Sequence, residues 1–170
     1  MSRTNYIISQ EKETALTLSL AETLLKENFN ASNSVIVTVS TDYSSNVGQL
    51  LRHALSYSGE VCDGFGIDVP YPDEIWDKRY IDELITLFDL YKYKLKDKKI
   101  LFVEAGVIRG SNYTFLLNFL QEHGLQIDIF YLSLFENKSS IFKSNFVGEY
   151  YDNETQNLTF WWEKENKHWI

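Results

Sequence analysis

The stretch KILFVEAGVIRGSNYT, residues 99–114, decides how the rest of the chain is interpreted. Four consecutive apolar residues, 100–103, predict a strand buried on both faces near the centre of a sheet. The acid Glu104 follows, and Gly106 and Gly110 predict a loop before an apolar helical pattern resumes. The first N–H groups of a helix are unpaired and attract anions. A strand, an acid, a loop and a helix N-terminus in this order therefore predict a phosphate-binding site.

The side chains of the loop support the same hypothesis. Gly106 and Gly110 permit backbone conformations that turn several N–H groups toward one anion. Ser111 and Asn112 add side-chain donors, and the guanidinium of Arg109 is suited to gripping a phosphate with two hydrogen bonds. The alternative interpretation is an ordinary turn from a strand to a helix, capped by Ser111 or Asn112.

The bulk composition restricts the class of protein. With 170 residues, 44% of them apolar, the chain is long enough for one domain with a substantial core. The net charge of −8 disfavours nucleic acid as a partner, because such binding depends on Lys and Arg that neutralise phosphates. No apolar run approaches the ~18 residues of a membrane span, and the first residues lack a signal-peptide core. Cys62 is the single cysteine, which excludes an internal disulfide and predicts a cytoplasmic protein.

Segments with strand patterns alternate with segments of helical periodicity along the chain. Strands are predicted at 34–39, 61–69, 100–103, 127–135, 146–151 and 158–162, and helices at 11–29, 47–55, 73–95 and 112–123. This alternation predicts an α/β fold, with helices on both faces of a mostly parallel central sheet in three αβα layers. Ligands of such sheets lie beyond the carboxyl ends of the strands, where the predicted loops 40–46 and 104–112 would meet.

The segment quoted first resembles the phosphoribosyl-diphosphate (PRPP) loop of the type I phosphoribosyltransferases. That loop has four apolar residues, two adjacent acids and a phosphate cradle of the form Thr-Gly-x-Thr. Matched residue by residue, Glu104 takes the place of the first acid, Ala105 the second, Arg109 the first Thr, Gly110 the glycine and Asn112 the last Thr. The resemblance implies that Glu104 is the catalytic acid that holds the ribose, and that the loop holds the 5′-phosphate.

The end of the chain resembles the hood of the purine-type enzymes of this family, where an aromatic residue and an acid surround the base. The residues concerned are KSNFVGEYYD (143–152) and LTFWWEKENKHW (158–169). The resemblance implies that Trp161 or Trp162 faces the base and that Glu163 takes the acidic position. A core or interface role is the alternative for these aromatic residues.

The resemblance covers roughly residues 34–165. It implies a single domain of the phosphoribosyltransferase type, with an N-terminal helical segment (1–33), a core (34–142) and a small C-terminal hood (143–170). The large apolar residues Trp169 and Ile170 at the end of the chain are typical of a terminus that contacts the body or a partner subunit, so a homo-oligomer stays open.

Two departures from the family pattern bear on catalysis. Ala105 stands where the family has a second acid, so its side chain cannot accept a hydrogen bond from the ribose. The loop 40–46 corresponds to the family's pyrophosphate loop, and the resemblance implies that its Thr41 and Asp42 contact the ligand. The loop lacks a glycine, and Asp42 would repel pyrophosphate unless Mg²⁺ lay between them. Two functions remain open: a phosphoribosyltransferase-like protein that binds PRPP or a nucleotide, with Mg²⁺, or a non-catalytic nucleotide sensor or protein-interaction module on the same fold.

Overall fold

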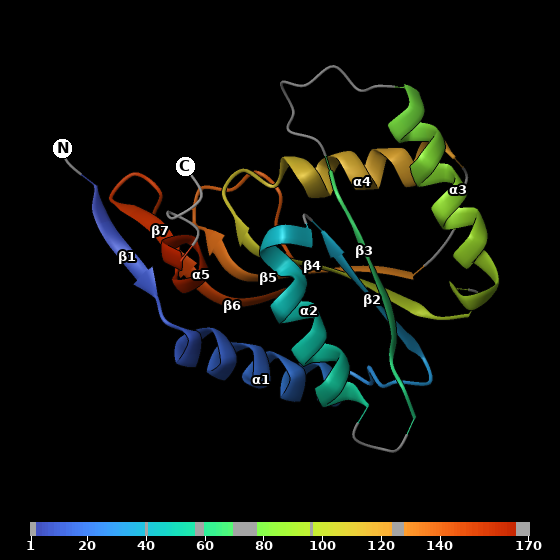
Figure 1. Ribbon diagram of the computed structural model, residues 1–170, viewed down its shortest axis with the longest axis horizontal. Helices are drawn as coiled ribbons and strands as arrows, with labels where there is room; N and C mark the ends of the chain where they lie inside the picture. Colours follow the sequence, from blue (N-terminus) through green and yellow to red (C-terminus); the bar gives the residue numbers. More distant parts are fainter. Residues whose placement is uncertain are drawn as a thin grey trace.

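The computed structural model describes residues 3–39, 41–56, 60–69, 78–95, 97–123 and 128–165. It confirms the α/β fold, with a parallel sheet between two layers of helices (Figure 1). The five strands of this sheet pair in the order β3-β2-β4-β5-β6, and all the pairs are parallel. Their bounds are β2 (Ser34–Val39), β3 (Asp63–Ile67), β4 (Lys99–Val107), β5 (Asp128–Asn137) and β6 (Phe146–Tyr151).

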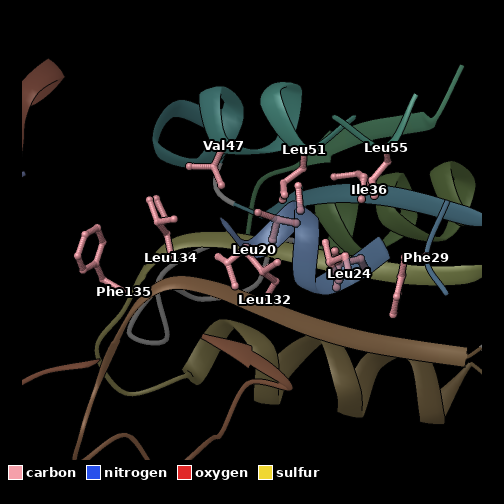
Figure 2. Packing of buried hydrophobic residues seen from close by; sticks show 14 of the residues in the cluster. Leu20, Leu24, Phe29, Ile36, Val47, Leu51, Leu55, Leu132, Leu134 and Phe135 are labelled. Carbon is pink, nitrogen blue, oxygen red and sulfur yellow. The ribbon is translucent and has the colours of Figure 1, made fainter. Parts of the chain in front are cut away.

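Two apolar layers cover the faces of this sheet. On one face lie α1 (Gln10–Lys26) and α2 (Thr41–Leu55), and Figure 2 shows their leucines packed against Ile36 of β2 and Leu132 of β5. On the other face lie α3 (Lys78–Leu95) and α4 (Ser111–Glu122), with Phe88 and Phe119 in the core. The apolar faces of these helices are thus buried against the two faces of the sheet.

A second, smaller sheet joins the two ends of the described chain. β1 (Thr4–Ile8) pairs in parallel with β7 (Gln156–Phe160), so that Thr4 lies opposite Gln156. The sequence analysis missed β1, because a five-residue strand with a partner about 150 residues away leaves no local signal. It also expected both late strands in the hood, whereas β6 extends the five-stranded sheet and only β7 lies beside β1.

The central strand β4 is longer than predicted. The strand was expected to end at Val103, with residues 104–112 in a loop, but it continues to Val107. Gly106 and Val107 still pair with Phe135 and Glu136 of β5, so their peptide groups take part in the sheet. Glu104, which we expected in the loop, is therefore held by a buried strand.

Two further predictions of local structure were wrong. Residues 41–46 form the first turns of α2 rather than a loop, since the capping residues Thr, Asp, Ser and Asn begin the helix here instead of preceding it. β7 ends at Phe160, and Trp161 and Trp162 lie in the short helix α5 (Trp161–Glu165) rather than in a strand. The helix predicted over 73–95 is present as α3, while residues 73–77 lie outside the described residues.

Within the described ranges, the structure holds no helix that combines the length and the apolar character of a membrane span.

Candidate functional site

A cavity of about 610 Å³ lies at the carboxyl end of β4, beside the start of α4. One wall is formed by residues 104–112, which include the last part of β4 and the turn into α4. The remaining walls come from the smaller sheet, from α2, from the end of β6 and from α5, through Arg3, Ser44, Tyr151, Asn153, Asn157, Leu158, Phe160, Trp162 and Glu163. The cavity is therefore at the sheet edge where the sequence predicted a ligand.

Gly110 makes the turn from β4 into α4. Its φ of 76° is in the left-handed region, and it is the N-cap of α4 without a side-chain hydrogen bond. A Cβ at this position would lie 2.4 Å from the Cβ of Phe142, so no larger residue fits without a shift of the backbone. The alternative interpretation, in which Ser111 or Asn112 caps the helix, is wrong, because the N-cap is Gly110. Because no side chain caps this helix start with a hydrogen bond, its first N–H groups stay available to an anion in the cavity.

Gly106 lines the cavity, but its backbone does not need glycine. Among the described glycines, Gly110 has a positive φ and Gly106 does not. A Cβ at Gly106 would lie 3.6 Å from the ring of Phe160, which is an ordinary van der Waals contact. The prediction that Gly106 supplies conformational freedom to a loop is wrong, because this residue is part of β4.

Glu104 presents a buried carboxyl group to the cavity. The side-chain amide of Asn112 donates a 2.8 Å hydrogen bond to its Oε1. Burial raises the pKa of Glu104 to about 8, against the opposing effect of the Asn112 hydrogen bond. At neutral pH the carboxyl group is therefore mostly protonated and can donate a hydrogen bond as well as accept one. Asn112 thus contacts Glu104 through its side-chain amide, and its contact with a phosphate stays a prediction.

Ala105 and Ser44, which both line the cavity, connect β4 to α2. Ala105 is buried, and its N–H donates a 3.0 Å hydrogen bond to the Oγ of Ser44. Thr41 and Asp42 lie in the first turn of α2, but the positions of their side chains fall outside the described part of the structure. Their contact with pyrophosphate stays a prediction.

Arg109 and Ser111 are exposed at the cavity. Within the described ranges Arg109 has no ion pair and no hydrogen bond from its side chain. A guanidinium without a carboxylate partner, next to a helix N-terminus, can bind an anionic group without breaking an existing contact.

The two tryptophans of α5 are held by one acid of α1. The indole N–H groups of Trp161 and Trp162 donate hydrogen bonds of 3.2 and 3.3 Å to the Oε2 of Glu13. The ring of Trp162 stacks on that of Phe160, with 4.8 Å between the centroids and 10° between the planes, and both residues line the cavity. Trp161 is not part of the lining, whereas Glu163 is, and burial raises the pKa of Glu163.

Three lining residues were missed by the sequence analysis: Arg3, Asn153 and Asn157. Tyr151, which also lines the cavity, lies in the segment 143–152 that resembles the hood. Asn153 lies between the strands predicted at 146–151 and 158–162, close to the segment that resembles the hood. No sequence pattern indicates Arg3, because it is the pairing of β1 with β7 that brings this residue to the cavity.

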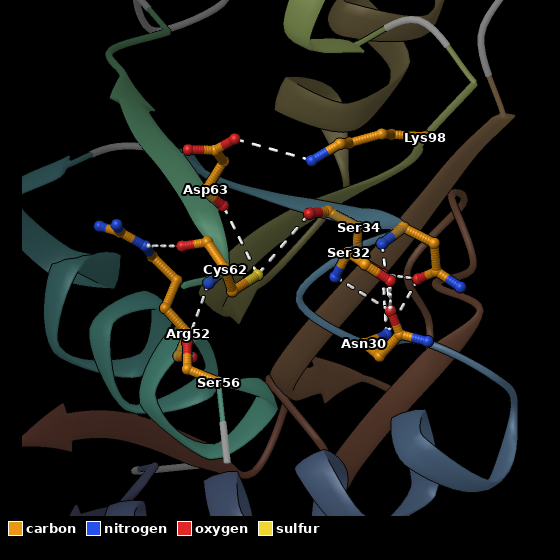
Figure 3. A network of polar contacts seen from close by, with 9 residues as sticks. Asn30, Ser32, Ser34, Arg52, Ser56, Cys62, Asp63 and Lys98 are labelled. Carbon is orange, nitrogen blue, oxygen red and sulfur yellow. Dashed lines mark hydrogen bonds and ion pairs between the residues drawn. The ribbon is translucent and has the colours of Figure 1, made fainter. Parts of the chain in front are cut away.

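A polar network around Cys62 lies at the opposite end of the sheet (Figure 3). The N–H of Cys62 donates to the Oγ of Ser56, and its carbonyl accepts from Arg52 at 3.0 Å, while Lys98 and Asp63 form an ion pair at 3.6 Å. Burial raises the pKa of the Cys62 thiol to about 11, which makes it a poor nucleophile. We assign this network a structural role.

Neither a protein-family model nor a curated protein matches the sequence. Solved structures do match over nearly the whole chain. The purine phosphoribosyltransferase of Pyrococcus horikoshii Ot3 is 16% identical with a TM-score of 0.66, over 94% of this chain and 93% of that chain. The xanthine-guanine-hypoxanthine phosphoribosyltransferase of Helicobacter pylori is 18% identical with a TM-score of 0.63, over 97% of each chain.

A third structure is that of a hypothetical protein from Neisseria gonorrhoeae with bound ppGpp. It is 13% identical to this chain with a TM-score of 0.67, over 99% of this chain and 96% of that chain. At these identities the likeness concerns the fold, and the element order, the sheet and the position of the cavity agree with it. The chain therefore has a type I phosphoribosyltransferase-like fold.

Proposed function

We propose that the cavity binds a phosphorylated ribosyl ligand, either a nucleotide or PRPP, with a phosphate at the N-terminus of α4. The observation that carries this proposal is the turn at Gly110, where a left-handed glycine leaves the start of α4 uncapped in the cavity wall. Arg109 and Ser111 beside it supply a cation and a hydroxyl for the same phosphate.

The rest of the cavity suits a sugar and a base. The protonated carboxyl of Glu104 lies where a ribose hydroxyl would find both a donor and an acceptor. The ring of Trp162, fixed by Phe160 and Glu13, offers a flat surface on which a base can stack. Two similar folds are named as purine phosphoribosyltransferases, and a third was solved with bound ppGpp, which supports a ligand of this class.

We infer that binding, rather than glycosyl transfer, is the main function. Transfer through an oxocarbenium-like state requires negative charge placed where positive charge develops. Ala105 cannot provide that charge, and burial keeps Glu104 mostly neutral at pH 7. These residues favour a nucleotide sensor over a transferase.

The side chains available as metal ligands also determine how Mg²⁺ would be bound. Among the described residues there is no group of three or more His, Cys, Asp or Glu side chains that could hold a metal ion. Mg²⁺ at phosphate sites is commonly bound by one or two carboxylates together with phosphate oxygens. We propose that Mg²⁺ enters with the diphosphate of the ligand, and that Glu104 would join its ligands only after losing its proton.

The test is calorimetric titration of the wild type and of Ser111→Glu with PRPP, GDP and ppGpp, in the presence of Mg²⁺. A carboxylate in the first turn of α4 stabilises the helix through its dipole, but it repels a phosphate in the cavity. We expect Ser111→Glu to fold at least as stably as the wild type and to bind at least about ten-fold more weakly.

Gln10→Glu is the matched control, since it adds the same charge to the first turn of α1, outside the cavity lining. It should bind like the wild type. Failure of all three ligands to bind the wild type, or equal affinity in Ser111→Glu, would contradict the proposal. A base-dependent release of pyrophosphate from PRPP that is lost in Glu104→Gln would show a transferase instead of a sensor.

A further inference from the structure

We propose that Arg3, together with Asn157 and Tyr151, forms a second anion subsite in the same cavity, so that the ligand carries an anionic group at each of two ends. This inference rests on the proposed function, because it places the first anionic group at the N-terminus of α4. It adds the chemical class of the ligand: a phosphorylated ribosyl compound with a second phosphate or a carboxylate.

The smaller sheet brings Arg3 to the cavity. Thr4 of β1 lies opposite Gln156 of β7, so the residue before the strand comes beside the start of β7. There the Nη1 of Arg3 donates a hydrogen bond of 3.5 Å to the Oδ1 of Asn157, and both residues line the cavity. This bond is long and exposed, and it uses a single one of the guanidinium's five donors.

The charge of Arg3 is not neutralised by a neighbour. In the part of the chain that the structure describes, no carboxylate forms an ion pair with Arg3. The same is true of Arg109 on the wall formed by residues 104–112. In a protein with a net charge of −8, two arginines without carboxylate partners face one cavity from different elements. Guanidinium groups in this condition bind phosphates and carboxylates with two hydrogen bonds.

Tyr151 lines the cavity together with Arg3 and Glu104. Burial raises the pKa of its hydroxyl to about 12, the charge of Arg3 opposes this rise, and Glu104 adds to it. The Tyr151 hydroxyl is therefore within electrostatic range of both Arg3 and Glu104.

The experiment uses two pairs of ligands that differ only in the second anionic group. GDP and ppGpp differ by a diphosphate on the 3′ oxygen of the ribose, and uridine 5′-monophosphate and orotidine 5′-monophosphate differ by one carboxylate on the base. The affinities of all four are measured by calorimetry for the wild type, Arg3→Gln, Arg3→Lys and the control Lys26→Gln. Lys26 is an exposed cation at the end of α1 and is not part of the cavity lining.

In at least one pair, we expect the wild type to bind the ligand with two anionic groups about ten-fold more tightly than its partner. Arg3→Gln should lose this preference, while its affinity for the ligand with one anionic group should not change. Arg3→Lys should keep part of the preference, and Lys26→Gln should keep all of it. The pair that shows the effect identifies the second group as phosphate or carboxylate.

Two results would overturn the inference while leaving the proposed function intact. One is a wild type that binds these ligands without preferring a second anionic group. The other is a preference that survives in Arg3→Gln. Failure of all four ligands to bind the wild type would instead contradict the proposed function, and this inference with it.

Discussion

At the scale of the single residue, Glu104 is the buried carboxyl group of the cavity, and its proposed role depends on its protonation state. Its folded pKa of about 8 lies above the ordinary value of 4.5, so the folded protein holds a proton that the unfolded chain has lost between these two pH values. Unfolding releases this proton. As the pH rises from 5 to 8, Glu104 therefore lowers the free energy of unfolding by up to about 1.4 kcal/mol per pH unit. Outside this range its contribution does not change with pH.

Glu104→Gln removes this titration, because an amide keeps a similar shape and does not ionise. We expect urea unfolding between pH 5 and pH 8 to show a weaker loss of stability with rising pH in the variant than in the wild type. Glu22→Gln, on the exposed face of α1, should retain the wild-type slope. Equal slopes in the wild type and in Glu104→Gln would show that the carboxyl is ionised in the folded protein.

The two glycines of the site differ in what they tolerate. Gly110→Ala places a Cβ 2.4 Å from that of Phe142, at a positive φ, and should cost about 3 kcal/mol of unfolding free energy. Gly106→Ala makes an ordinary contact with Phe160 and should stay within about 0.5 kcal/mol of the wild type. Urea unfolding measures both, and equal costs would contradict the assignment of Gly110 as the conformationally required residue.

At this scale the sequence predicted Glu104 and Gly110 as site positions, because an acid after an apolar strand and a glycine before a helix are local signals. It placed Gly106 in a loop rather than in β4, and it did not predict the contact between Asn112 and Glu104. Both differences come from the end of β4, which lies four residues beyond the predicted one. The extension depends on pairing with β5 and is not visible in the residues themselves.

At the scale of the element, α5 is fixed to α1 by Glu13. Both indole N–H groups of α5 donate to one carboxyl oxygen, whose group is buried and has a raised pKa because of that burial. Removal of the acceptor breaks both of these hydrogen bonds between α5 and α1. Their loss costs stability and frees the helix to move.

Glu13→Ala should therefore lower the free energy of unfolding by about 2 kcal/mol and shift tryptophan emission to longer wavelength as α5 loosens. Glu13→Gln retains a carbonyl oxygen as an acceptor, so its free energy of unfolding should fall by less. Glu22→Ala, exposed on the same helix, controls for the change in helix propensity. An emission spectrum that is unchanged in Glu13→Ala would rule out this link between α1 and α5.

At the scale of the whole molecule, the cavity is completed by both ends of the described chain. Local patterns predicted the alternation of strands and helices, and hence the parallel sheet and the edge at which the cavity lies. They could not predict that β1 pairs with β7, since two short strands at opposite ends of the sequence carry no shared signal. Arg3 and Asn157 are far apart in the sequence, and the fold brings both to one cavity.

The central claim is that a phosphate lies at the turn into α4, and backbone amide shifts test it most directly. ¹⁵N-labelled protein is titrated with PRPP and with ppGpp, in the presence of Mg²⁺. We predict saturable shifts of the amides of Gly110, Ser111 and Asn112 with at least one of the two ligands, and unchanged amides of Ser34 and Cys62 at the opposite end of the sheet. Absence of shifts with both ligands, or shifts that leave residues 110–112 unchanged, would contradict the account.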